Sequence, residues 1–120
     1  GAWYSRVAVE VMEALSRPKP VKLIVNTLNR GAIEGMPSDA CVEIPSLLSN
    51  AGVEPLHIGE VEASIMGLIS QVKAYERLAI KAAVNRDRDM AFLALVANPL
   101  VPSVGKAEEV LQALITRNLI

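Results

Sequence analysis

Apolar and polar residues follow two different periods along this chain, and each change of period marks the boundary of a predicted element. From Ala2 to Ser16 apolar side chains recur every three or four residues, which is typical of an amphipathic helix. Pro18 and Pro20 follow, and we expect them to end the helix because proline disfavours helical backbone at the residue before it. From Val21 to Asn29 apolar and polar residues alternate, which predicts a β-strand.

The same criteria predict two more strands and three more helices. The strands are Ala40–Ile44, ended by Pro45, and Val53–Ile58, which follows a turn signal at residues 49–52. The helices run from Glu60 to about Asn85, from an Asp87 cap to Ala97, and from Lys106 to Asn118. This order predicts an α+β fold, a small three-stranded sheet packed with about four helices. With 120 residues, the chain 1–120 is predicted to be a single domain.

The connection between the first two strands carries Asn29, Arg30 and Gly31, followed by the apolar pair Ala32 and Ile33. It is too long and too apolar for a hairpin turn, since hairpin loops have about 2–5 residues and are built from Gly, Asn and Asp. Loops of this kind on a rigid scaffold commonly hold substrate contacts. Asn29 and Arg30 are therefore candidate substrate-binding residues, and a guanidinium group suits a phosphate. The alternative for Arg30 is a turn residue in solvent.

Two aromatic residues, Trp3 and Tyr4, lie at the start of the first predicted helix. Aromatic rings form platforms on which sugars stack, and tyrosine adds a polar group. Trp3 and Tyr4 are therefore candidate substrate-binding residues that would form a pocket wall. The alternative is that both rings pack in an interface.

Composition and charge exclude several classes of function. Proteins that bind nucleic acids neutralise the phosphate backbone with an excess of Lys and Arg. This chain has a net charge of −1, so we expect no nucleic acid partner. The longest apolar runs are far shorter than the roughly 20 residues needed to cross a bilayer, so we expect no membrane partner. A single cysteine, Cys41, fits a reducing, cytoplasmic compartment, and its place in a strand pattern predicts a buried, inert thiol.

Familiar catalytic and cofactor motifs are missing from the sequence. It contains no G-x-G-x-x-G nucleotide loop, no H-E-x-x-H metal motif and no nucleophile elbow. One cysteine and one histidine do not make a metal site, and His57 lies in a strand pattern where we expect a structural role. We therefore assign no catalytic, cofactor-binding or metal-binding residue within this chain.

The chain has the features of a piece of a larger protein. Apolar residues make up 52% of it, although aromatic residues make up only 3%. Either an apolar face packs on a missing domain, or the excess is used in a tight core of small aliphatic residues. The chain also opens on Gly1 and enters a helix within a few residues. We expect it to belong to a larger enzyme and to form a homo-oligomer.

Several motifs, in order, resemble those of the 6-phospho-β-glucosidases of glycoside hydrolase family 4. GAWYS at residues 1–5 resembles that family's G-A-Y-Y-S, and VNTLNRGAI at 25–33 resembles its V-N-T-x-N-N-G-A-I. DACVEIP at 39–45 resembles its D-A-V-V-E-V-P. The resemblance continues through GL at 67–68, VKAYERL at 72–78 and NPLVP at 98–102. The sequence departs from the family at Arg30, where a second Asn is commoner.

The resemblance implies an enzyme that uses NAD and a divalent metal, usually Mn²⁺. Such enzymes are an exception to paired-carboxylate glycosidases. In that family the C3 hydroxyl is oxidised by hydride transfer, the C2 proton is lost, the glycosidic bond breaks by elimination, water then adds, and the hydride returns. The family's nucleotide-binding glycines, metal-binding Cys and His and tyrosine base are implied to precede Gly1. Cys41 and His57 fall in other motifs and do not correspond to those metal ligands.

The order of elements also resembles the C-terminal domain of lactate and malate dehydrogenases. This likeness implies that the chain forms the distal wall of a sugar-phosphate site and part of a subunit interface. Two other interpretations remain open: a stand-alone helical interaction module, and the C-terminal domain of a 2-hydroxy acid dehydrogenase.

Overall fold

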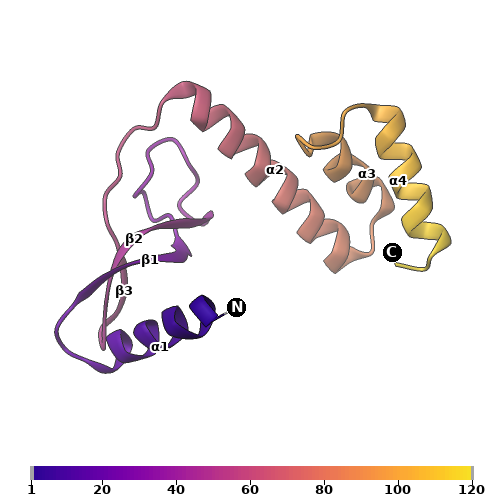
Figure 1. The fold of residues 1–120 in the computed structure, drawn as a ribbon. Coiled ribbons are helices and arrows are strands. Elements are labelled where there is room, and N and C mark those ends of the chain that lie inside the picture. Colours follow the sequence, from indigo (N-terminus) through magenta and orange to yellow (C-terminus); the bar gives the residue numbers. More distant parts are fainter. Residues whose placement is uncertain (1, 120) are drawn as a thin grey trace. The chain divides into compact units, whose positions relative to one another are not determined.

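The computed structural model describes residues 2–119, which form an α+β arrangement of four helices and three strands, as predicted (Figure 1). The residues group into two compact units, one within residues 1–61 and the other within residues 62–120. The sheet belongs to the first unit, together with one helix, and the other three helices form the second. Whether the whole chain acts as one domain of a longer enzyme stays a prediction.

The first unit is a helix beside an antiparallel sheet. Helix α1 (Ala2–Ser16) is followed by β1 (Val21–Leu28), β2 (Cys41–Ser49) and β3 (Gly52–Pro55), and β2 is the central strand. Helix α1 contacts β2, and its Ala14 is buried. Alternation along β2 turns Val42, Ile44, Ser46 and Leu48 inward, so these residues form the core of the unit.

Pro45 lies within the central strand, and the prediction that it ends this strand was wrong. It pairs with Ile24 of β1, while the ladder between β2 and β3 begins only at Ser46. The Pro45 carbonyl accepts a hydrogen bond from the Leu56 amide at 3.0 Å. In an antiparallel sheet the nitrogen and the carbonyl of one residue face the same neighbouring strand. The Pro45 nitrogen therefore faces Leu56, as its carbonyl does, and Leu56 lies beyond the end of β3. The missing N–H therefore removes no ladder bond.

The third strand is shorter than predicted, since it ends at Pro55 rather than Ile58. The next residues leave the sheet and pair with the β1–β2 loop instead: the amides of Ile58 and Gly59 both donate to the Ala32 carbonyl, at 2.8 and 3.0 Å. The turn predicted at residues 49–52 is confirmed, because Ser49 pairs with Gly52 across it. Gly52 has a φ of 113°, a conformation that favours glycine.

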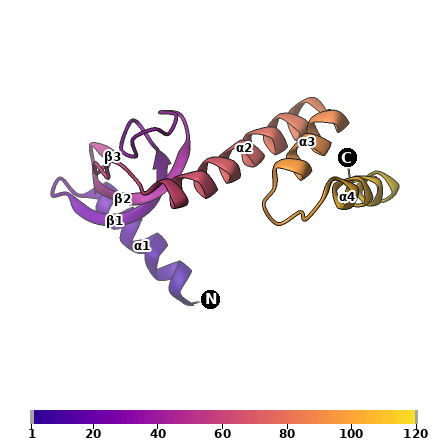
Figure 2. The same cartoon turned by 90° about the horizontal axis from the view of Figure 1, so that it is seen from above.

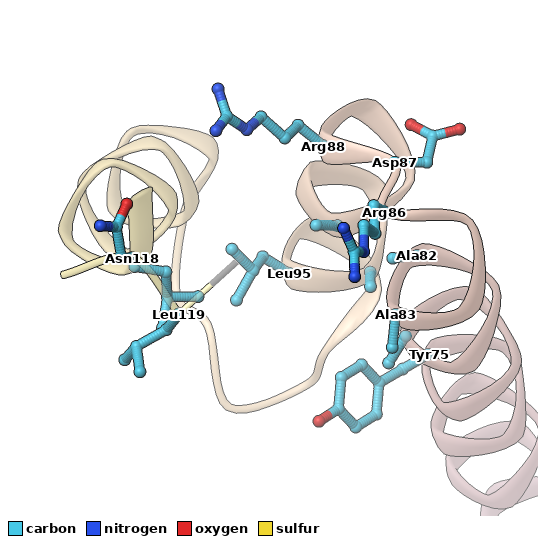
Figure 3. Close-up of a pocket in the computed structure, with 13 residues that line it drawn as sticks. Tyr75, Ala82, Ala83, Arg86, Asp87, Arg88, Leu95, Asn118 and Leu119 are labelled. Atoms are coloured by element: carbon cyan, nitrogen blue, oxygen red, sulfur yellow. The ribbon is translucent and has the colours of Figure 1, made fainter. Parts of the chain in front are cut away.

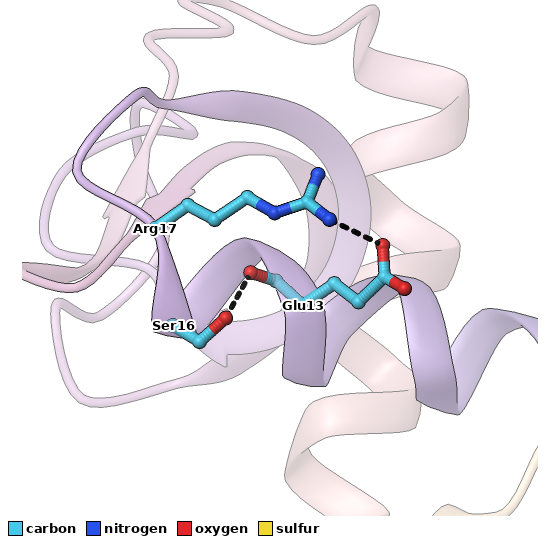
Figure 4. A network of polar contacts seen from close by, with 3 residues as sticks. All are labelled: Glu13, Ser16 and Arg17. Atoms are coloured by element: carbon cyan, nitrogen blue, oxygen red, sulfur yellow. Dashed lines mark hydrogen bonds and ion pairs between the residues drawn. The ribbon is translucent and has the colours of Figure 1, made fainter.

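The end of α1 carries a group of polar contacts among Glu13, Ser16 and Arg17 (Figure 4) and is joined to the β2–β3 turn. The Ser16 hydroxyl donates to the Glu13 carbonyl at 2.8 Å, and the Arg17 guanidinium lies 3.2 Å from the Glu13 carboxylate. The Arg17 carbonyl accepts a hydrogen bond from the Asn50 amide at 2.8 Å. Since both charged side chains are mostly exposed, their ion pair contributes little, and the backbone bond is what joins helix to turn.

The second unit contains α2 (Ala63–Asn85), α3 (Arg88–Ala97) and α4 (Val104–Thr116). Figure 2 shows α3 running beside α2, with which it is in contact. The Asp87 cap is confirmed, because its carboxylate accepts hydrogen bonds from the amides of Asp89 and Met90 at 3.0 Å. No helix in the described part of the chain is long and apolar enough to cross a membrane.

Two of these helices begin at other residues than predicted. Helix α2 starts at Ala63, after Glu62, so Glu60 lies outside it. Helix α4 starts earlier than predicted because the Ser103 hydroxyl caps it, accepting a hydrogen bond from the Lys106 amide at 3.2 Å.

Candidate functional site

The connection between β1 and β2 is a folded loop with a core of its own. Ala32, Ile33, Met36 and Ala40 are all less than 9% exposed, so the apolar residues that exclude a hairpin turn are packed inside. Between them the backbone reverses at left-handed positions, with φ values of 47° at Arg30, 85° at Gly31 and 79° at Gly35. Such conformations suit glycine, and Arg30 adopts one without that freedom.

Asn29 lies at the centre of this loop, and its side chain is fully buried. The amide nitrogen donates to the carbonyls of Ile33, Met36 and Pro37, at 3.1, 3.0 and 3.3 Å. The amide oxygen accepts a hydrogen bond from the Ile33 backbone at 2.7 Å. Both N–H groups and the oxygen of this side chain are therefore used to hold the loop.

A second set of bonds joins the loop to the segment that follows β3. Ile33 forms a parallel bridge with Gly59, and the Glu34 amide donates to the Gly59 carbonyl at 3.0 Å. Beside this bridge the His57 Nε2 atom lies 3.5 Å from a Glu34 carboxylate oxygen, and both side chains are more than half exposed. This neighbour of His57 could not be predicted from the sequence, because only the folded loop brings Glu34 beside it.

The structure places the four candidate substrate-binding residues on two elements. Asn29 and Arg30 are adjacent in the loop, Asn29 buried and Arg30 exposed. Trp3 and Tyr4 lie on the first turn of α1 and are 76% and 83% exposed. Both rings are thus open to a partner or a ligand. The substrate-binding role of these four residues stays a prediction.

Cys41 is exposed, and the prediction of a buried thiol was wrong. It is the first residue of β2, and the alternation that turns Val42 and Ile44 into the core turns Cys41 to the opposite face. In the part of the chain that the structure describes, no three His, Cys, Asp or Glu side chains gather as metal ligands would.

The second unit holds a pocket of about 600 Å³ that sequence reasoning missed (Figure 3). Alanines form much of its wall, and Figure 3 shows Leu95 projecting from α3 toward Asn118 and Leu119. The only signal in the sequence was the density of small residues on α2 and α3, which does not distinguish a tight helix contact from an opening. The lining residues are Tyr75, Ala79, Ala82, Ala83, Arg86, Asp87, Arg88, Ala91, Ala94, Leu95, Leu114, Asn118 and Leu119.

Comparison with known proteins gives a match that covers most of the chain. Residues 2–101 match the model of the family 4 glycosyl hydrolase C-terminal domain. A "Probable 6-phospho-beta-glucosidase" of Bacillus subtilis is 37% identical over 96% of this chain, and a 6-phospho-beta-glucosidase of Thermotoga maritima is 35% identical over 98%. The chain spans only 26% and 28% of the lengths of these relatives.

Solved structures give the same result for the fold. The T. maritima 6-phospho-beta glucosidase, determined with NAD and glucose-6-phosphate, matches 98% of this chain with a TM-score of 0.90 and 35% identity. A 6-phospho-alpha-glucosidase from gut microorganisms, with NAD and glucose-6-phosphate, matches 96% with a TM-score of 0.90 and 34% identity. The chain covers 29% and 26% of those two structures. The chain therefore belongs to glycosyl hydrolase family 4, whose C-terminal domain it matches over residues 2–101.

Proposed function

We propose that this chain is the substrate-side part of an NAD- and divalent-metal-dependent 6-phospho-β-glucosidase. The reaction would hydrolyse O-glycosidic bonds of phosphorylated disaccharides by oxidation and elimination. The observation that carries the proposal is the family match over residues 2–101. Relatives of both branches have similar identities, 35–37% for three 6-phospho-beta-glucosidases and 31% and 34% for two phospho-alpha-glucosidases, so our choice of the β branch rests on the GAWYS motif at residues 1–5.

NAD and Mn²⁺ occur in solved structures of the relatives, but the described residues of this chain do not fit either group. No cluster of potential metal ligands is present among them. The left-handed glycines of the first unit do not form the G-x-G-x-x-G turn that opens a helix onto a pyrophosphate. Both groups would be held by residues outside this chain.

The contribution of this chain would be to bind the phosphorylated sugar. Arg30 offers an exposed guanidinium on an ordered loop, a group that binds phosphate through two parallel hydrogen bonds. Trp3 and Tyr4 have two alternative roles, an aromatic wall for the sugar ring or packing in the subunit interface proposed below. A longer enzyme of this kind would act in the cytoplasm, where sugar phosphates are found.

The longer enzyme should hydrolyse 4-nitrophenyl 6-phospho-β-glucoside when NAD and Mn²⁺ are supplied. We expect a chelator to abolish release of 4-nitrophenol and Mn²⁺ to restore it. The α anomer tests the branch, and 4-nitrophenyl β-glucoside without the phosphate tests the need for that group. Equal turnover of the unphosphorylated glucoside would contradict the proposed substrate class, and turnover of the α anomer alone would move the enzyme to the other branch.

We also propose that the chain contributes a subunit interface, and we expect it to self-associate. Trp3, Tyr4, Val7 and Leu15 lie on one side of α1 and are each 39% or more exposed, an apolar area that soluble monomers rarely leave uncovered. Sedimentation at micromolar concentration should give a dimer or a larger species, and the double variant Trp3→Ser, Tyr4→Ser should weaken it. A single species of 12.9 kDa for the unmodified chain would contradict the prediction.

A further inference from the structure

The loop that carries Arg30 is shaped from within by one residue. Beyond its four side-chain bonds, Asn29 donates its own amide to the Ala40 carbonyl at 2.8 Å and accepts the Ala32 amide on its carbonyl at 2.8 Å. These bonds connect both ends of the loop and its middle to the residue directly before Arg30. The buried side chain of Asn29 therefore holds the middle of the loop, and its backbone adds a bond to the residue that precedes β2.

The exposed part of the loop is the next two residues. Arg30 and Gly31 are exposed, and both have positive φ, a conformation that Arg30 adopts only where the surroundings hold it. The Arg30 amide donates to the Ser38 carbonyl at 2.9 Å, so the far side of the loop restrains it. The direction in which the loop presents Arg30 thus depends on bonds that Asn29 organises.

We propose that Asn29 is a positioning residue for substrate: it fixes the loop that presents Arg30 to the phosphate and does not touch the sugar itself. This inference rests on the proposed function, because the ligand of Arg30 is then the 6-phospho group. The geometry of the Asn29 side chain supports a role through Arg30 rather than a direct contact with the sugar. Both polar atoms of its amide are directed at the loop backbone and not at solvent.

The test uses the longer enzyme and four variants: Asn29→Ala, Arg30→Ala, the double variant, and Asn26→Ala as a matched control on the exposed face of β1. We expect Asn29→Ala and Arg30→Ala each to raise KM for 4-nitrophenyl 6-phospho-β-glucoside about tenfold or more, because one variant misplaces and the other removes the group that binds the phosphate. The double variant should be no worse than Arg30→Ala alone, since Asn29 acts through Arg30. Asn26→Ala should leave KM unchanged.

Hydrogen exchange supplies a readout that does not depend on activity. In the unmodified chain the Ile33 amide donates to the side-chain oxygen of Asn29, so it should exchange faster in Asn29→Ala. The amides of Val42 and Ile44 in β2 should keep their protection. If Asn29→Ala does not fold, Gly31→Ala replaces it. A Cβ added at Gly31 meets no atom within 4 Å, but the φ of 85° would strain the backbone beside Arg30. KM should therefore rise while the Ile33 amide stays protected from exchange.

The outcomes separate this inference from the proposed function. If the unmodified enzyme is active but the two single effects multiply in the double variant, Asn29 acts independently of Arg30 and the inference fails alone. An unchanged KM in Asn29→Ala, or in Gly31→Ala where that variant replaces it, overturns it as well. If the unmodified enzyme neither turns over the phosphorylated glucoside nor binds glucose-6-phosphate, the proposed function fails, and faster exchange at Ile33 would then leave Asn29 with a purely structural role.

Discussion

The 120-residue chain, purified by itself, should release no 4-nitrophenol from 4-nitrophenyl 6-phospho-β-glucoside, even with NAD and Mn²⁺. The chemistry that we propose for the longer enzyme needs a nucleotide site and a metal site. The described residues offer no cluster of metal ligands, and the sequence lacks a nucleotide-binding glycine motif. Loss of both groups removes the reaction entirely rather than slowing it, so we expect a rate equal to that without protein.

The longer enzyme, assayed in parallel under the same conditions, is the control for this result. The test also needs evidence that the isolated chain is folded, for which the circular dichroism of its four helices is sufficient. Turnover by the folded isolated chain that a chelator abolishes would show that these residues hold a metal site after all. It would also contradict our assignment of the chemistry to residues outside the chain.

The sequence predicted elements well where local chemistry decides them. Helix α1 has the bounds expected from its periodicity, and the Asp87 cap was recognised because a side chain that accepts amide hydrogen bonds favours one position at a helix start. The β2–β3 turn was visible for the same reason, since glycine alone tolerates the backbone at residue 52 without strain. In each case the neighbouring residues carry all the information.

Prediction failed where the decisive contact is distant in sequence. Pro45 is tolerated in a central strand only because β3 ends beside it, and the residues after Pro55 leave the sheet because the β1–β2 loop offers them partners. The burial of Cys41 was misjudged because alternation gives two faces but does not say which one is covered. The pocket between helices of the second unit likewise depends on packing that periodicity does not determine.

The candidate site shows the same division. A functional loop was predicted from its length and its unusual composition, and the structure shows an ordered loop at that place. The function of its first residue was beyond the sequence, because an asparagine that binds a ligand and one that binds three backbone carbonyls look alike. Only the structure shows that the Asn29 amide is buried and faces inward.

Replacement of Leu48 by alanine should destabilise the first unit by about 2–5 kcal/mol, the usual cost of emptying a leucine site in a core. Leu48 is fully buried in the central strand, where it is paired with Val21 on one side and Val53 on the other. Truncation of the Leu48 side chain therefore removes contacts with both neighbouring strands at once. Urea unfolding followed by circular dichroism, with hydrogen exchange of β2 amides to isolate the sheet, would measure the change.

Ile24→Ala is the matched control, because it removes a similar aliphatic side chain from the same sheet at a position that is 64% exposed. In the isolated chain we expect this change to cost about 1 kcal/mol or less, the range of strand preference on a solvent-facing surface. Equal costs for the two variants would contradict the core described here. In the longer enzyme the comparison gains a second use: if Ile24→Ala becomes as costly as Leu48→Ala, another part of that enzyme covers the outer face of this sheet.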